Sequence, residues 1–99
     1  MAEYYQHSGI TIRFDVFADG KEATPTSAFV LPYDPDKEFL GRDAAKIKGN
    51  EVRYILKGSK VEKVGKYSFV FRVRVGELGE YTHVVEIPVQ RLPVPVGNK

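Results

Sequence analysis

The sequence predicts an all-β fold, an antiparallel sandwich of about six to eight strands. Apolar residues recur at every second position in several runs, turns rich in Gly and Pro separate these runs, and no run alternates with a long helical pattern. The chain has 99 residues, which is enough for one domain with a buried core and too few for two.

The first strand is expected over residues 10–18. Its inward side chains are Ile10, Ile12, Phe14 and Val16. Asp19-Gly20 ends it with a tight turn, because Gly accepts a positive φ without steric cost. A second strand is expected over residues 28–33, near a sheet edge, because Pro32 has no N–H to donate.

The middle of the chain holds a turn, an irregular window and a third strand. Pro35 and the acids around it predict a turn over residues 34–38. Residues 42–48 form the only window that could be helical, and we expect an irregular loop there or at most one short helical turn. Alternation returns over residues 51–57, where Val52, Tyr54 and Leu56 share one face.

The clearest strand spans residues 66–75. Five large apolar side chains share its inward face: Tyr67, Phe69, Phe71, Val73 and Val75. The run Gly76-Glu77-Leu78-Gly79 reverses the chain, and a return strand over residues 81–89 completes a long hairpin.

Three segments are expected: a lead segment (1–8), the sandwich domain (9–90) and an extended tail (91–99). Pro93 and Pro95 exclude the tail from a regular central strand. The tail is interpreted as a docking segment or an inconsequential chain end. If it docks, deletion of residues 92–99 should weaken assembly and leave the thermal midpoint nearly unchanged. The first residues lack the basic and apolar regions of a signal peptide, so we expect synthesis in the cytoplasm without export.

Charge and residue types exclude several classes of function. Fifteen Lys and Arg against thirteen Asp and Glu give a net charge of +2, too small to favour nucleic acid or an anionic membrane as a partner. Without Cys there is no disulfide and no thiol nucleophile. His7 and His83 have no nucleophile motif beside them. We therefore expect no enzyme, no cofactor and no small-molecule ligand.

Two motifs are consistent with either a binding role or an ordinary structural role. Asp34, Asp36 and Glu38 offer oxygens to Ca²⁺, but three acids are too few for its six to eight ligands, so a solvated turn and no metal site are expected. The aromatic run over residues 65–71 is similar to a base-stacking strand, yet a sandwich needs these rings in its core. An OB-like barrel that binds single strands with Arg72 and Arg74 stays open as an alternative.

The outward faces of the strands suggest a protein interface. The alternation along each strand places Ile55, Val70 and Val84 on outward faces, among charged residues. They form one apolar patch if their strands are neighbours. An ordinary surface is the equal alternative. The candidate interface residues are Ile55, Val70, Arg72, Arg74, Val84, Leu92, Val94 and Val96.

Four segments carry a family resemblance: residues 9–14, 19–20, 33–36 and 65–73. In this pattern the chain resembles Ig-like β-sandwich modules of tailed-phage virion proteins, above all the N-terminal module of baseplate upper proteins and short phage structural proteins. The resemblance implies an Ig-like sandwich and a virion protein with a packing role only. No catalytic residue is carried over.

The expected function is therefore non-enzymatic: a structural or assembly protein in a phage baseplate, tail, connector or capsid decoration. Its expected partners are other virion proteins or copies of itself, and its expected location is the virion. The alternative is a module that binds carbohydrate at a cell surface through exposed tyrosines such as Tyr4, Tyr5 and Tyr33. A single-stranded nucleic-acid binder is the third possibility.

Overall fold

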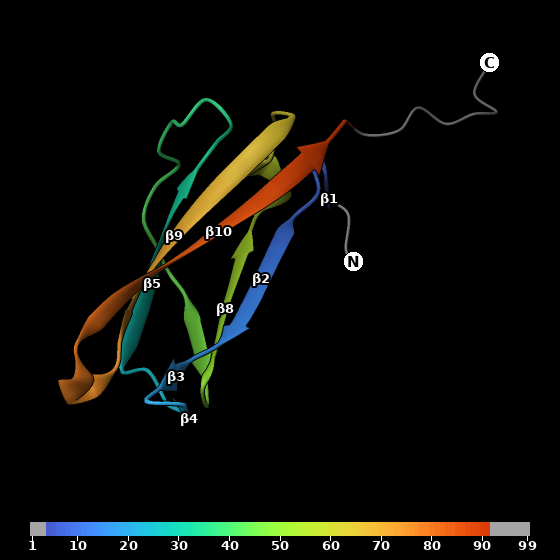
Figure 1. Cartoon of the computed structure of the whole chain (residues 1–99). Helices are drawn as coiled ribbons and strands as arrows, with labels where there is room; N and C mark the ends of the chain where they lie inside the picture. Colours follow the sequence, from blue (N-terminus) through green and yellow to red (C-terminus); the bar gives the residue numbers. More distant parts are fainter. Residues whose placement is uncertain (1–3, 92–99) are drawn as a thin grey trace, which may run out of the picture.

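The computed structural model describes residues 4–91, and these form an all-β fold, as predicted (Figure 1). The strands are β1 (Tyr4–Tyr5), β2 (Ile10–Asp15), β3 (Phe17–Ala18), β4 (Lys21–Glu22), β5 (Ser27–Tyr33), β6 (Asp43–Ala44), β7 (Lys46–Lys48), β8 (Glu51–Leu56), β9 (Gly65–Arg74) and β10 (Glu80–Gln90). Two short 3-10 turns occur, η1 (Gly58–Lys60) and η2 (Gly76–Leu78). Four strands have only two residues each, which is why there are more strands than expected. Over this range the chain has no helix long and apolar enough to cross a membrane.

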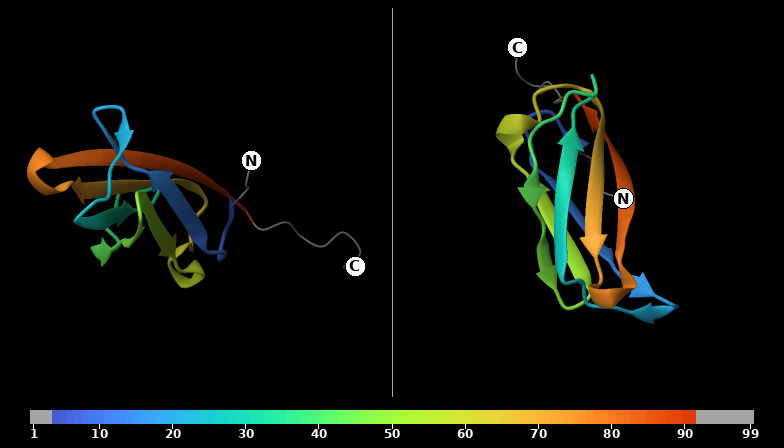
Figure 2. Two further views of the ribbon diagram at one scale, coloured as in Figure 1. Left: turned by 90° about the horizontal axis from the view of Figure 1, so that it is seen from below. Right: turned by 90° about the vertical axis from the view of Figure 1, so that its left-hand side faces the viewer.

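The strands form two main sheets. The five-stranded sheet has the order β1-β10-β9-β5-β6, and the three-stranded sheet has the order β2-β8-β7. Figure 2 shows the sheets as two layers, and all pairs are antiparallel except β1 with β10. The β3–β4 hairpin is a separate ribbon that projects at one end of the molecule (Figure 1). Its turn at Asp19 and Gly20 has positive φ at both residues, as the sequence predicts for a tight hairpin.

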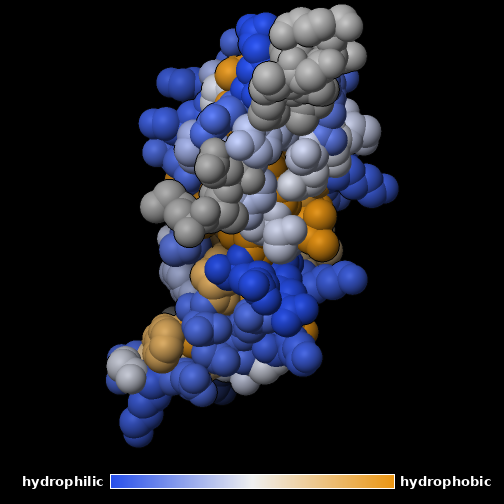
Figure 3. All heavy atoms as spheres, turned by 90° about the vertical axis from the view of Figure 1, so that its right-hand side faces the viewer, coloured by the Kyte–Doolittle hydropathy of each residue, from blue (hydrophilic) through white to orange (hydrophobic). Residues whose placement is uncertain are grey.

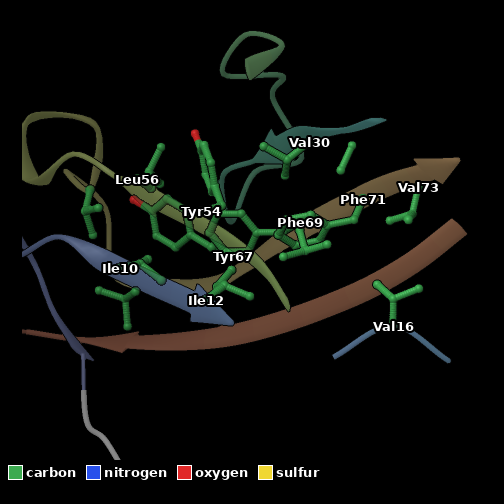
Figure 4. Close-up of a cluster of buried hydrophobic side chains, with 14 of the residues drawn as sticks. Ile10, Ile12, Val16, Val30, Tyr54, Leu56, Tyr67, Phe69, Phe71 and Val73 are labelled. Atoms are coloured by element: carbon green, nitrogen blue, oxygen red, sulfur yellow. The ribbon is translucent and has the colours of Figure 1, made fainter. Parts of the chain in front are cut away.

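The core lies between the two layers and is built by the alternation along β2, β8 and β9 (Figure 4). Tyr67, Phe69, Phe71 and Val73 of β9 are each fully buried. They face Ile10, Ile12, Val52, Tyr54 and Leu56 of the opposite sheet. Rings meet across the layers, with Phe14 edge-on to Phe71 at 4.9 Å between centroids. The inward set predicted for β9 is therefore confirmed.

Residues 42–48 contain strands instead of the expected loop or helical turn. β6 pairs with β5 in one sheet, and β7 pairs with β8 in the other. Ala45 connects them, and its N–H donates to the Ala28 carbonyl at 3.1 Å. Ile47 packs against the core from β7. Pairing thus decides a window whose own residues have no strong preference, through the earlier strand β5 for β6 and through the directly following strand β8 for β7.

The lead segment belongs to the domain from Tyr4 onward, so the boundary expected at residue 8 lies too far along the chain. β1 pairs in parallel with the end of β10, Tyr4 with Val89 and Tyr5 with Gln90. The His7 N–H donates to the Val61 carbonyl at 2.6 Å. β1 lies at the edge of the five-stranded sheet and has only two residues, so it needs no alternating pattern of its own. The tail residues 92–99 lie outside the described residues.

Gly58 lets the lead segment approach closely. A Cβ built on Gly58 would lie 2.3 Å from the carbonyl oxygen of His7, which is backbone and cannot rotate away. We expect Gly58→Ala to lower the free energy of unfolding by about 1–2 kcal/mol. We also expect it to increase amide hydrogen exchange at Gln6 and His7.

Gly9→Ala is the matched control, since its Cβ would lie 3.3 Å from the Leu56 carbonyl oxygen, a milder contact. Chemical denaturation and hydrogen exchange measure both variants. Equal behaviour of the two variants would contradict a tightly docked lead segment.

Candidate protein interface

The outer face of the five-stranded sheet carries an apolar row across three strands. In β9, Ser68, Val70, Arg72 and Arg74 point away from the core, because their neighbours fill it. The register places Val70 directly beside Leu31 of β5 and Val84 of β10. Val84 is 56% exposed, and Leu31 and Val70 are half-buried. The three side chains form a continuous strip, which we call the apolar row.

Aromatic side chains of β5 and of the loop after it lie beside the apolar row. Phe29 lies beside Arg72 in the adjacent row, and the Arg42 guanidinium stands 4.0 Å above the Phe29 ring centroid. Phe39 contacts Tyr33 at 5.5 Å between centroids and is 53% exposed. A cation over an aromatic face fixes the position of both groups. The loop thus presents ordered rings next to the apolar row.

Charged pairs border the apolar row on β9 and β10. Arg72 forms an ion pair with Glu80, and Lys66 lies 3.7 Å from Glu86. Each of these pairs is neutral as a whole. An apolar centre with a polar border is the composition of a protein contact site.

The structure brings some of the predicted interface residues together and separates others. Val70, Val84, Arg72 and Arg74 share the outer face of the five-stranded sheet. Ile55 does not join them, because β8 belongs to the three-stranded sheet and Ile55 points outward from it, 63% exposed. The condition for one patch that includes Ile55, that its strand is a neighbour of β9 and β10, is therefore not met. The predicted residues Leu92, Val94 and Val96 lie outside the described residues.

The sequence did not indicate Phe29, Leu31 and Phe39 as members of this surface. The outward parity of Phe29 and Leu31 on β5 is readable, but their proximity to Val70 depends on β5 lying beside β9. Phe39 lies in the loop after β5, where alternation gives no information. Strand order is a long-range property that alternation does not encode.

The tyrosines suggested for carbohydrate binding do not converge. Tyr4 packs against the core, and its hydroxyl donates to the Thr11 carbonyl at 2.8 Å. Tyr33 is on β5, separated from β1 by β9 and β10. His83 is half-buried on the inner side of β10, where its ring lies 4.3 Å from the Phe14 ring. These contacts give the groups structural roles.

The acidic turn after β5 is expected to be solvated, but in the structure hydrogen bonds hold it. Asp34 is only 5% exposed, and its Oδ1 accepts the N–H groups of Asp36 and Glu38, both at 2.9 Å. The Lys63 ammonium lies 2.9 Å from Asp34 Oδ2 and 2.8 Å from Asp36 Oδ2. A lysine thus occupies the place where these acids would hold a cation.

The titration of this cluster reflects its hydrogen bonds. Burial raises the pKa of Asp34, but the hydrogen bonds from Lys63 and from two backbone N–H groups outweigh it and hold the pKa below its ordinary value. Hydrogen bonds to Asp36 and Asp34 in turn raise the pKa of Lys63. Among the residues that the structure describes, no group of three or more His, Cys, Asp or Glu could hold a metal ion.

The side of the molecule seen in Figure 3 is mostly hydrophilic, and its hydrophobic atoms form separate spots. The apolar row is different in kind, since its members are direct neighbours across three strands. No protein-family model, curated protein or solved structure matches this chain.

Proposed function

We propose that the chain is an Ig-like β-sandwich module and a non-enzymatic structural or assembly protein of a phage virion. Its strand order supports the fold assignment. β2, β8 and β7 take the places of strands B, E and D of an Ig-like sandwich, and β5, β9 and β10 take those of strands C, F and G. The resemblance of the strand and turn motifs to tailed-phage modules supports a place in a baseplate, tail, connector or capsid decoration.

The apolar row carries the proposal of a protein contact. A cross-strand strip with a half-exposed valine, ordered rings on one side and paired charges on the other suits the centre of an interface. Its partner in this proposal is another virion protein or a second copy of the chain. Flat sheet faces bind flat protein surfaces better than small molecules, which need a concave site.

Val84→Asp tests this interface. Val84 is 56% exposed, so a carboxylate there stays hydrated in the free protein and the fold should be retained. In a complex the same carboxylate would be buried without a partner, so we expect binding to weaken at least about tenfold. Co-sedimentation of the purified chain with virion particles measures binding to another virion protein. Sedimentation velocity of the chain alone measures binding to a second copy.

Val64→Asp is the matched control, because Val64 is 45% exposed and lies in the loop before β9, outside the apolar row. It should bind like the parent chain. The interface proposal fails if Val84→Asp binds as well as Val64→Asp does. The virion proposal fails if mass spectrometry never finds the chain in particles from its source.

Glycan-array and oligonucleotide titrations test the alternative functions. Specific glycan binding would favour the carbohydrate module, and tight oligonucleotide binding at stated salt would favour the nucleic-acid binder. Either result without particle association would replace the virion proposal.

A further inference from the structure

A cleft of about 520 Å³ lies on the three-stranded sheet, away from the apolar row. It is lined by Thr11, Arg13, Asp43, Ala44, Lys46, Arg53, Tyr54, Ile55, Leu56, Lys57 and Lys60. The lining comes from β2, from β8 and the residues directly after it, and from the segment that crosses between the two sheets. Two properties of this cleft, an unpaired stretch of strand and an excess of positive charge, indicate what it binds.

The unpaired stretch lies in the second half of β8. β2 pairs with β8 along its whole length, from Glu51 to Leu56. β7 covers the other side of β8 only as far as Arg53, because the preceding residues leave for the other sheet, where β6 pairs with β5. Within residues 4–91, Tyr54–Leu56 therefore have no strand neighbour on that side, and this stretch lines the cleft. An open strand edge is a template for another strand.

The charge of the cleft is strongly positive for a chain with a net charge of only +2. Five Lys or Arg and one Asp line it. Arg53 forms an ion pair with Glu51, but Arg13, Lys46, Lys57 and Lys60 form none with any acid that the structure describes. Asp43 is occupied, since its Oδ2 accepts the Tyr54 hydroxyl at 2.6 Å. The free cations are complementary to carboxylates.

We propose that this cleft binds an extended acidic segment of a partner protein, which adds as a strand beside Tyr54–Leu56 of β8. The segment's main chain pairs with the open edge, as in other cases of strand addition. Its carboxylates contact the unpaired lysines, and an apolar side chain packs on Ile55, which is 63% exposed. The cleft shares no residue with the apolar row. The proposal therefore does not depend on the proposed interface or on the proposed place in a virion.

A peptide fits this cleft better than a single-stranded nucleic acid. Proteins bind single strands by stacking bases on exposed aromatic rings. The only aromatic residue in the lining is Tyr54, which is 6% exposed and has its hydroxyl bound to Asp43. Burial raises the pKa of the Tyr54 phenol, and the hydrogen bond to Asp43 raises it further, so the hydroxyl stays protonated and donates to Asp43.

Fluorescence anisotropy with a labelled peptide tests the inference on the full chain. The probe is an alternating glutamate–valine peptide of about seven residues, roughly 23 Å when extended. A second probe has the same sequence with N-methyl groups on alternate amides, which removes strand pairing and keeps the charge. A third is an oligothymidylate of matched charge. We expect the first probe to bind and the N-methylated probe to bind at least about tenfold more weakly.

Charge reversal locates the site. Lys46→Glu with Lys57→Glu should weaken binding of the first probe at least about tenfold. The control is Lys21→Glu with Lys37→Glu, which changes net charge equally at exposed positions outside the cleft and should bind like the parent chain. Both double variants are first compared by thermal unfolding, so that loss of fold is recognised.

Three results would overturn the inference. The acidic peptide does not bind, or it binds equally with and without N-methylation, or the oligothymidylate binds more tightly than the peptide. The second result would make the cleft a general anion surface, and the third would make it a nucleic-acid site.

Discussion

Phe69→Ala and Phe71→Ala are each expected to lower the free energy of unfolding by about 3–5 kcal/mol. Both side chains are fully buried in β9. The Phe71 ring meets Phe14 at 4.9 Å and Tyr54 at 6.3 Å between centroids, so its removal leaves a cavity shared by both sheets. A domain of this size is stable by about 5–15 kcal/mol in total. Either variant should therefore be close to unfolded at room temperature, as measured by denaturant titration.

Arg72→Ala is the control from the same strand and the opposite face. Its ion pair with Glu80 is partly exposed, and such pairs contribute little to stability. We expect a change within about 0.5 kcal/mol. Equal denaturation midpoints for the three variants would mean that the faces of β9 are assigned wrongly.

Alternation predicted the inward residues well because a strand has only two faces. Tyr67, Phe69 and Phe71 were expected inside and are buried. In β8 the same parity correctly separated Tyr54 from the exposed Ile55. Turn residues such as Asp19-Gly20 were predictable for the same local reason, since their φ angles depend on the residue itself.

Features that depend on distant partners could not be predicted in this way. β1 exists because the end of β10 offers it an edge, and β6 and β7 exist because two different sheets pair with neighbouring residues. None of these short segments has a strong local pattern. For β1 and β6 the pairing partner is not adjacent in the chain, whereas β7 pairs with β8 across the two-residue turn at Gly49 and Asn50.

The candidate interface shows the same limit. Parity marked Ile55, Val70 and Val84 as outward, but parity does not say which sheet a strand joins. The register makes Val70 and Val84 neighbours and puts Ile55 on the other layer. As a result the apolar row and the basic cleft are separate surfaces, and Ile55 lines the cleft.

Asp34 is the other position where the sequence predicted a turn but not its environment. Its partner Lys63 lies far along the chain, and the cluster they form joins the turn after β5 to the loop before β9. The Tyr67 hydroxyl accepts the Lys63 N–H at 3.0 Å, which connects the same loop to the core. The carboxylate thus organises both loops at this end of the five-stranded sheet.

Asp34→Ala is expected to lower the free energy of unfolding by about 2–3 kcal/mol at neutral pH, because two backbone N–H groups and an ammonium lose their acceptor. Asp34→Asn should cost less, since its carbonyl oxygen can still accept the N–H groups of the turn. Asp36→Asn is the control. The Asp36 side chain is 68% exposed, and its only hydrogen bond in this cluster is the one it accepts from Lys63. Its effect should stay within about 0.5 kcal/mol.

The pH dependence identifies the charge of Asp34 as the cause. The pKa of Asp34 is lower in the folded chain than its ordinary value, so its ionised form favours folding. That contribution is complete above the ordinary carboxylate pKa of about 4 and is lost as the pH falls through the lower folded value. The difference in stability between the parent chain and Asp34→Asn should therefore be largest at neutral pH and shrink below about pH 4. Denaturant titrations at a series of pH values measure it, and a difference independent of pH would show that the Asp34 charge contributes nothing.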